Sequence, residues 1–305
     1  MPNRDPLQKA GPFFETTMES IEWVECPRDA MQGITSFIST ADKIRYINRL
    51  LKVGFDAIDF GSFVSPKAIP QMRDTAEVLA GLDTSVKTRL LAIVANERGG
   101  EEACLHERIA FLGYPLSISE TFQMRNTNRS ISESMATVAR LQELCLNHKK
   151  ELVVYISMAF GNPYGDPWSP DLSEQTIEEL YKIGVNTVAL ADTVGIAEAT
   201  TVHSMFNQLI PAFPSIRFGA HLHCSPSNWM TKVEAAYAAG CRRFDSAMKG
   251  YGGCPMAKDD LVGNLASENL LHYCNSRSIQ TGIDLPAFQE ALESANLVFS
   301  GPQAT

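Results

Sequence analysis

The sequence predicts a single (β/α)8 barrel, that is, a TIM barrel, with short additional helices at its C-terminal end. Short apolar segments alternate with amphipathic helical segments along the chain, and no Gly/Ser-rich linker divides it into halves. The length of 305 residues is also usual for one barrel of this kind. An open doubly wound sheet is the alternative, but it usually has a glycine-rich phosphate turn after its first strand, and this sequence has none. We expect residues 1–19 to be an extension that precedes a barrel domain of residues 20–305.

The predicted strands are short runs rich in Val, Ile, Leu and Phe. Strands that are buried on both faces of a parallel sheet have such continuous apolar runs. In chain order the strands are predicted at Ile21–Glu25, Phe55–Phe60, Arg89–Val94, Arg108–Leu112, Leu152–Met158, Thr187–Ala191, Ile216–His221 and Arg243–Ser246.

The segments between the strands have apolar residues spaced three and four positions apart, which is typical of helices that cover a barrel. The first helix is expected to begin at a Thr cap, and the longest at Ser130, with Glu133 in its first turn. The helices are predicted at Thr40–Val53, Gln71–Leu82, Ser130–His148, Ser173–Ile183, Ala199–Leu209 and Trp229–Ala239, with Leu261–Cys274 and Pro286–Ala295 after the last strand.

Composition excludes several classes of protein. A formal net charge of −9 without a Lys/Arg cluster argues against a nucleic-acid partner. The seven cysteines are odd in number and form no CxxC pair, so neither a disulfide framework nor a structural zinc site is indicated. No apolar stretch approaches the roughly 18 residues of a spanning helix, and the N-terminus resembles neither a signal peptide nor a transit peptide. We therefore predict a cytoplasmic protein with no membrane partner.

Polar residues fall at the C-terminal ends of many predicted strands, where barrel enzymes place their catalytic groups. Loops are polar in general, but the coincidence at so many strand ends favours an active site. These residues are Arg28 and Asp29 after the first strand, Asp59 at the end of the second, Asp192 after the sixth, His221 and His223 at the seventh, and Cys254 beyond the eighth.

Four residues could bind one metal ion. Residues i and i+2 of a strand point to the same side, so His221 and His223 can share a cation. In a closed barrel the eighth strand neighbours both the first and the seventh, so Asp29 can face this pair and Asn264 can close the ring. Taken singly, the histidines could be packed or surface residues, Asp29 a cap, and Asn264 the N-cap of a helix. Together they form a nitrogen and oxygen set suited to Mg²⁺ or Mn²⁺, while Zn²⁺ and Fe²⁺ stay open.

A cysteine flanked by glycines follows the last strand, in the run Gly250-Tyr251-Gly252-Gly253-Cys254-Pro255. Glycines let a backbone fold tightly around a substrate, and a thiol there can transfer a proton or attack carbon. Cys104, Cys145, Cys241 and Cys274 are interpreted as small buried hydrophobic residues. The thiol and the histidine pair together suggest metal-assisted carbon chemistry.

After the first strand stands Pro27-Arg28-Asp29-Ala30-Met31-Gln32, which resembles the PRDGLQ signature of 3-hydroxy-3-methylglutaryl-CoA lyases. Two further motifs are specific to these lyases among the metal-dependent lyase and condensing-enzyme barrels: Ser62–Lys67 (SFVSPK) followed by a PQM sequence, and Gly252–Pro255 (GGCP). The resemblance continues through Ser119–Phe122, Asp192–Gly195 and Gly263–Glu268 and spans about residues 20–295.

The resemblance implies a retro-Claisen cleavage of an acyl-CoA such as 3-hydroxy-3-methylglutaryl-CoA to acetyl-CoA and acetoacetate, in leucine degradation, by a homodimer. It implies that Arg28 stabilises the enolate oxygen, that Cys254 is the loop cysteine, and that Asp59 replaces a catalytic glutamate. Arg28 and Asp59 could instead form only a salt bridge at the rim. The proposed base is His221 or a bound water, with Asp59 as the competitor. By the same resemblance the metal ligands are Asp29, His221, His223 and Asn264, and the substrate-binding residues are Gln32, Ser62, Asp192 and Thr193.

The chain also departs from the family pattern at several positions. The glutamate four residues before the arginine is Val24 here, although Glu25 or Glu22 could replace it. The other departures are Ala30, Gly33, Cys224 and Ala189, with one residue inserted between Cys254 and Asn264. Two alternatives therefore stay open: a related carbon–carbon lyase or aldolase with another hydroxyacyl-CoA or hydroxy acid as substrate, and a non-catalytic ligand-binding barrel.

Overall fold

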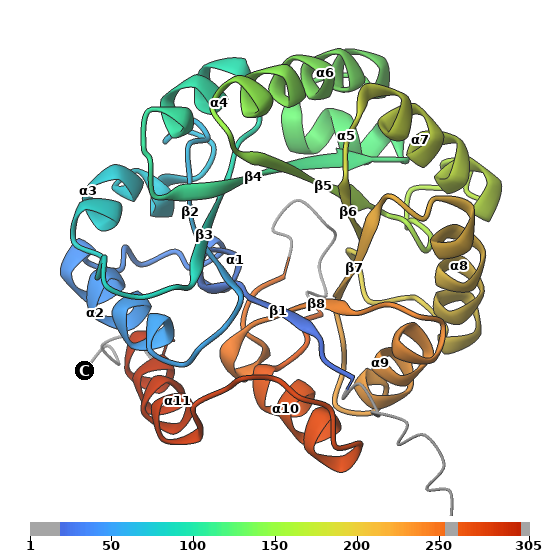
Figure 1. Ribbon diagram of the computed structural model, residues 1–305. Helices are drawn as coiled ribbons and strands as arrows, with labels where there is room; N and C mark the ends of the chain where they lie inside the picture. Colours follow the sequence, from blue (N-terminus) through green and yellow to red (C-terminus); the bar gives the residue numbers. More distant parts are fainter. Residues whose placement is uncertain (1–18, 254–261, 300–305) are drawn as a thin grey trace, which may run out of the picture.

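The computed structural model describes residues 19–253 and 262–299, and its eight strands close into a parallel barrel in the order of the chain. Each strand pairs with the next, and the eighth pairs with the first. Figure 1 shows the helices arranged as a ring outside the strands. The predicted TIM barrel is confirmed, and the open doubly wound sheet is excluded. The strands are β1 (Glu22–Glu25), β2 (Ala57–Ser62), β3 (Arg89–Ile93), β4 (Ile109–Ser117), β5 (Glu151–Ser157), β6 (Thr187–Asp192), β7 (Arg217–Leu222) and β8 (Arg243–Ser246).

The helices include two that follow the last strand, as the sequence predicts, and they pack outside the barrel (Figure 1). The α-helices are α1 (Pro27–Gln32), α2 (Thr40–Leu51), α3 (Thr75–Ala80), α4 (Glu97–Cys104), α5 (Glu120–Thr127), α6 (Ile131–Asn147), α7 (Pro170–Ile183), α8 (Ala199–Ala212), α9 (Trp229–Ala238), α10 (Ser267–Ser276) and α11 (Leu285–Phe299). Two short 3₁₀ helices are η1 (Pro70–Met72) and η2 (Met248–Gly250).

Three short helices, α1, α4 and α5, were not predicted, because six to eight residues are too few to establish a helical period. Arg28 and Asp29 therefore lie on a helix and not in a loop. That helix starts with Pro27 in its first turn, where the missing N–H of proline costs nothing. In α4 and α5 the starts are fixed by the side chains of Asn96 and Ser119, which accept hydrogen bonds from backbone N–H groups.

Several predicted boundaries were wrong. The helix predicted over 71–82 is divided into η1 and α3, and β4 extends to Ser117, well beyond the predicted end. The cap of α2 is Ser39 and not a Thr, since the Ser39 hydroxyl accepts from the N–H of Asp42. The start of α6 at Ser130 is confirmed, and Ser130 and Glu133 form a capping box there.

Apolar side chains form two separate layers. The larger cluster fills the space between strands and helices, and a smaller one lies inside the barrel. The interior cluster consists of Val24, Cys26, Ala57, Leu91, Ile93, Phe111, Val153, Tyr155 and Ala189. The described helices include none that is long and apolar enough to cross a membrane.

Candidate active site

A cavity of about 130 Å³ lies at the C-terminal ends of the strands, where barrel enzymes have their active sites. Its charged and titratable lining residues are Arg28, Asp29, His221, His223 and, at the barrel interior, Tyr155. Most of the other lining residues are apolar. Its lining is completed by Gln32, Val64, Ala68, Ile69, Ile93, Ala95, Pro115, Phe122, Asn126, Ser157, Ala191 and Thr193.

The Arg28 guanidinium is held on three sides by side chains. Its Nε and Nη2 donate to Oδ2 of Asp59 at 3.0 and 2.6 Å, and its Nη1 donates to Oδ1 of Asp29 at 3.1 Å. The same Nη1 donates to Oε1 of Gln32 at 2.7 Å. Burial lowers the pKa of Arg28, but the charges of Asp59 and Asp29 outweigh it and raise the pKa overall. A fixed, permanently charged guanidinium therefore lines the cavity, and these contacts leave one N–H, on Nη2, for a ligand.

Asp59 lies within β2 and not at its end, two residues after Ala57 and thus on the interior side of the barrel. Its carboxylate is 1% exposed, and both of its oxygens accept from Arg28. Burial raises the pKa of Asp59 to about 6, although the charge of Arg28 acts in the opposite direction. The geometry makes Asp59 the residue that orients Arg28.

Three side chains form a cluster with metal-ligand geometry. The ligand atoms of Asp29, His221 and His223 all lie within 4.8 Å of one another, and Nε2 of His221 is 3.9 Å from Oδ2 of Asp29. Asn264 joins them, because its Nδ2 donates to Oδ2 of Asp29 at 2.7 Å and its backbone forms a bridge with His223. Asn264 is not a helix N-cap, since α10 begins three residues later, at Ser267. The four residues therefore converge.

Two members of the cluster, Asp29 and His223, have protonation states that suit a cation. Burial raises the pKa of Asp29, but the charges of Arg28 and the two histidines outweigh it and lower the pKa overall. Burial and the neighbouring His221 lower the pKa of His223 to about 4. Nδ1 of His223 lies 2.9 Å from the carbonyl oxygen of Val262, so it donates there and leaves the lone pair of Nε2 free. An ionised carboxylate and a neutral imidazole are the forms that bind metal ions.

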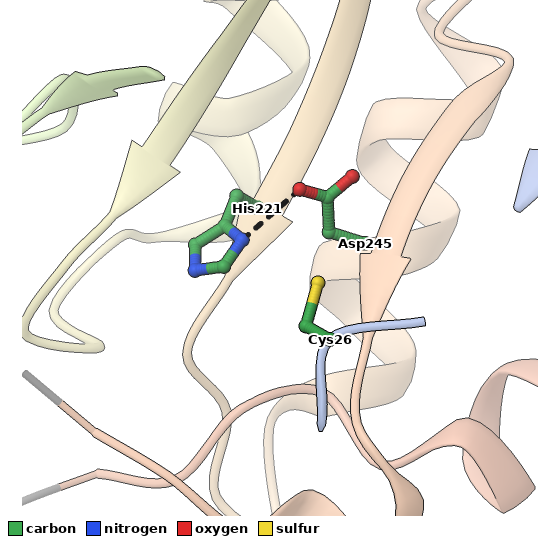
Figure 2. Close-up of side chains that lie close together, drawn as sticks. All are labelled: Cys26, His221 and Asp245. Carbon is green, nitrogen blue, oxygen red and sulfur yellow. Dashed lines mark hydrogen bonds and ion pairs between the residues drawn. The ribbon is translucent and has the colours of Figure 1, made fainter. Parts of the chain in front are cut away.

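A second cluster shares His221 on its opposite ring edge. Figure 2 shows Cys26, His221 and Asp245 together, with Nδ1 of His221 3.2 Å from Oδ2 of Asp245. Burial and the charge of Asp245 raise the pKa of the Cys26 thiol, and a protonated thiol does not bind metal. With Nδ1 at Asp245 and Nε2 towards Asp29, His221 has no nitrogen left to act as a base once Nε2 binds a cation.

Asp245 was missed by the sequence interpretation. It stands in the predicted last strand, Arg243–Ser246, two residues after Arg243 and therefore on the same side of the strand. Two opposite charges on the interior side of a buried barrel strand were the signal that could have identified it.

The four predicted substrate-binding residues separate into two pairs. Gln32 and Thr193 line the cavity, whereas Ser62 and Asp192 are not among its lining residues. The Ser62 hydroxyl donates to the carbonyl oxygen of Ile93 at 3.2 Å. Asp192 is paired with Lys232 at 2.6 Å and accepts from the N–H of Ala197. Asp192 and Thr193 are adjacent, so their side chains leave the backbone in different directions, and only Thr193 reaches the cavity.

Neither glutamate near the first strand replaces the family's glutamate at position 24. Glu25 accepts hydrogen bonds from the N–H of Met248 and the hydroxyl of Ser267, outside the barrel. Glu22 is paired with arginines at the other end of the strands. Val24 and Ala189, two of the departures from the pattern, both belong to the apolar cluster inside the barrel.

Cys254 lies outside the described residues, but the glycines before it are described. Gly252 has a φ of +109°, and a Cβ there would lie 2.4 Å from Nδ2 of Asn264. The backbone therefore needs glycine, both for its conformation and for its close approach to Asn264. The carbonyl oxygen of Tyr251 accepts from the same Nδ2 at 2.9 Å. The start of this loop is thus attached to the candidate metal cluster.

The fold and the site together define a class of protein: a TIM-barrel enzyme with a charged cavity and a candidate metal cluster at the C-terminal ends of its strands. Comparison with known proteins identifies the family. Residues 20–295 match the HMGL-like family, and the chain belongs to this family of acyl-CoA carbon–carbon lyases. Members use a divalent metal, in agreement with the histidine and carboxylate cluster.

The proteins that are similar to this chain are named for different substrates. The chain is 34% identical to 3-hydroxy-3-isohexenylglutaryl-CoA/hydroxy-methylglutaryl-CoA lyase of Pseudomonas aeruginosa, over 87% of this chain and 88% of that protein. It is 32% identical to (R)-citramalyl-CoA lyase of Chloroflexus aurantiacus, over 93% of each. The structure of an HMG-CoA lyase from Acinetobacter baumannii, in complex with coenzyme A and 3-methylmalate, superposes with a TM-score of 0.86 at 30% identity over 92% of each chain.

Proposed function

We propose that this lyase cleaves 3-hydroxy-3-methylglutaryl-CoA, or a close relative of it, to acetyl-CoA and a 3-oxo acid, which for this substrate is acetoacetate. The observation that carries the proposal is the convergence of Asp29, His221, His223 and Asn264 beside Arg28 at one cavity. These five residues come from α1, from the C-terminal end of β7 and from the segment before α10, far apart in the sequence.

In this proposal Asp29, His221, His223 and Asn264 hold a divalent cation, Mg²⁺ or Mn²⁺, with Zn²⁺ as a further possibility. When bound, such an ion supplies Lewis-acid polarisation of a substrate oxygen. The residues that are present fit it, because an ionised carboxylate and neutral imidazole nitrogen lie within one small cluster, and the amide group of Asn264 contacts that carboxylate.

Arg28 stabilises the charge that develops on the thioester oxygen. In a retro-Claisen cleavage the hydroxyl loses its proton, its oxygen forms a carbonyl, and the bond between the second and third carbons breaks. The electron pair of that bond moves into the thioester enolate, which then takes a proton at carbon. Preorganised donors that face the enolate oxygen lower the barrier most effectively when they cannot reorient, and Asp59 fixes Arg28 in this way.

Other site residues have supporting roles in the proposal. Gln32 lies between Arg28 and Asp29, donating to Oδ1 of Asp29 at 2.7 Å, and keeps both oriented at the cavity wall. Thr193 lines the cavity as a substrate contact. Cys254 is proposed as the donor of the proton to the enolate carbon. A bound water is the proposed proton acceptor for the hydroxyl, because His221 has no free nitrogen once its Nε2 binds the cation. Asp59 is disfavoured because both of its oxygens already accept from Arg28.

A second candidate substrate is another hydroxyacyl-CoA with a less polar substituent. It is favoured by Val24 and Ala189, which place apolar groups inside the barrel where the family pattern has a glutamate and a serine. The relatives named for isohexenylglutaryl-CoA and citramalyl-CoA define the panel to be tested.

The decisive experiment is a coupled assay of acetyl-CoA release after treatment with EDTA, with and without added Mg²⁺ or Mn²⁺. We expect turnover with 3-hydroxy-3-methylglutaryl-CoA only when a divalent cation is restored. Faster turnover of another thioester in the panel would identify that hydroxyacyl-CoA, the second candidate, as the substrate. Bound metal without turnover of any acyl-CoA would instead favour a non-catalytic ligand-binding barrel.

We further propose a homodimer in the cytoplasm that acts in leucine degradation. Relatives from rat and mouse are named as cytoplasmic and mitochondrial enzymes, respectively, so their names do not decide the compartment. Light scattering during size-exclusion chromatography tests the dimer, since a monomer mass would contradict it.

A further inference from the structure

One interaction inside the barrel joins a candidate metal ligand to a buried carboxylate that no step of the proposed reaction uses. The register of the sheet pairs His221 of β7 with Asp245 of β8 directly. Oδ2 of Asp245 lies 3.2 Å from Nδ1 of His221, and the Asp245 side chain has no exposed surface (Figure 2). The contact is therefore built into the pairing of two adjacent strands.

The other oxygen of the same carboxylate is held from deeper inside the barrel. Nη1 of Arg243 lies 2.9 Å from Oδ1 of Asp245 in a buried ion pair, which is held by charge because its geometry is not that of a hydrogen bond. Gly219, opposite Arg243 on β7, makes room for this side chain, because a Cβ there would lie 2.5 Å from Nη1. Each oxygen of Asp245 thus has its own partner, and rotation of the carboxylate would break both contacts.

The ring of His221 also packs against an aromatic side chain. Tyr155 and His221 form a T-shaped pair, with ring centroids 5.7 Å apart and an interplanar angle of 82°. The Tyr155 hydroxyl accepts a hydrogen bond from Nη2 of Arg243 at 3.4 Å. Arg243, Asp245 and Tyr155 therefore form a buried frame around one imidazole.

A hydrogen bond from Nδ1–H to a carboxylate fixes both the orientation and the tautomer of an imidazole, and leaves the lone pair on Nε2. In this protein Nε2 of His221 is the nitrogen that faces Asp29. Without Asp245 the ring could rotate, and the proton could move to Nε2, where it would block a metal ion.

We propose that Asp245 is a positioning residue that presents Nε2 of His221 to the divalent cation, and that Arg243 holds Asp245 in place for this purpose. The proposal rests on the cation site of the proposed function. It assigns a role to a carboxylate that lies below the cavity and touches neither substrate nor cation.

The test is the affinity of the full-length protein for Mn²⁺, measured by electron paramagnetic resonance of free Mn²⁺ without substrate. Removing Asp245 alone would leave Arg243 buried and unpaired, so both charges are removed together in Arg243→Met/Asp245→Ala and Arg243→Met/Asp245→Asn. The matched control is Lys43→Met/Asp74→Asn, which removes another buried ion pair of 2.6 Å in the helical layer. His221→Ala sets the loss expected when the ligand is absent, and circular dichroism verifies the fold of each variant.

We expect Mn²⁺ to bind the Asp245→Ala double variant roughly 10- to 100-fold more weakly than the wild type. The Asn variant should recover part of this loss, because its amide oxygen can still accept from Nδ1–H. The control pair should bind Mn²⁺ as the wild type does.

A folded Asp245→Ala double variant with an Mn²⁺ affinity within about twofold of the wild type would overturn the positioning role alone. An equal loss in the control pair would also overturn it, since the effect would then come from general destabilisation. If the wild type itself binds no Mn²⁺, the cation site of the proposed function is wrong, and the role of Asp245 is wrong with it.

Discussion

Two buried ion pairs at the C-terminal ends of the strands have the same chemistry and different surroundings. Arg28 pairs with Asp59 of β2 at 2.6 Å, and Lys232 of α9 pairs with Asp192 of β6 at the same distance. The first pair faces the interior of the barrel, and its arginine lines the cavity. The second lies in the layer between the sheet and the helices. The two pairs are both buried and have the same kinds of charge. What separates the pair at the cavity from the structural pair is the side of the sheet to which the strand directs its side chain.

The hydrogen-bond donors of the two cationic side chains, Lys232 and Arg28, show the same contrast. Nζ of Lys232 donates to Asp192, to the carbonyl oxygen of Gly195 at 2.9 Å and to that of His223 at 3.0 Å. An ammonium has three hydrogens, so none is left for a ligand. Lys232 instead connects the loops after β6 and β7. Arg28 has five N–H groups and remains part of the cavity wall.

The prediction with the largest expected effect concerns the structural ion pair of Lys232 and Asp192. Lys232→Met would leave Asp192 buried without its partner and should lower the free energy of unfolding by about 3–5 kcal/mol, measured by urea denaturation. The double variant Lys232→Met/Asp192→Asn should recover most of the loss. Equal destabilisation of the single and double variants would show that Asp192 does not need the positively charged side chain of Lys232.

The next prediction concerns Arg28 of the Arg28–Asp59 pair, which is proposed to act in catalysis. Arg28→Gln should reduce kcat by about 100-fold or more, because it removes a preorganised charged donor, while Mn²⁺ affinity and the circular dichroism spectrum stay close to those of the wild type. Arg45→Gln is the control, since its ion pair with Asp42 is on the surface of α2. Near-normal turnover of Arg28→Gln would remove this arginine from the chemistry.

The smallest effect, counted per pH unit, concerns a third buried carboxyl group, Glu25, which has hydrogen-bond donors but no cationic partner among the described residues. Burial raises its pKa from 4.5 to about 8. The folded protein therefore holds this proton more tightly than the unfolded chain. The stabilisation is complete below the unfolded pKa and is lost as the pH rises through the folded value.

Glu25→Gln should therefore remove a dependence of stability on pH. Between about pH 5 and 8 the free energy of unfolding of the wild type should fall by up to about 1.4 kcal/mol per pH unit more steeply than that of the variant. Urea denaturation across this range measures both slopes. Parallel slopes would mean that Glu25 titrates normally, and that burial without a cation has no large cost at this position.

Most of the fold could be predicted from the sequence because each barrel strand is an apolar run of its own. The ends of elements were harder: α1 has only six residues, and its start depends on Pro27 and on packing against β2. The convergence of Asp29, His221, His223 and Asn264 could be predicted from strand order alone, since β8 lies between β1 and β7. The role of Asp245 could not, because it depends on His221 lying opposite it on the neighbouring strand.

The amino-acid sequence by itself determined the barrel, the order of its strands and the residues able to bind a cation. These depend on local hydrophobicity and on residue type, which are properties of short segments. Only the tertiary structure decided that Asp59 orients Arg28, that Asp192 pairs with Lys232, and that Asp245 holds His221. Those roles depend on which face of a strand a side chain occupies and on what the neighbouring strand places opposite it, and both are fixed only when the barrel closes.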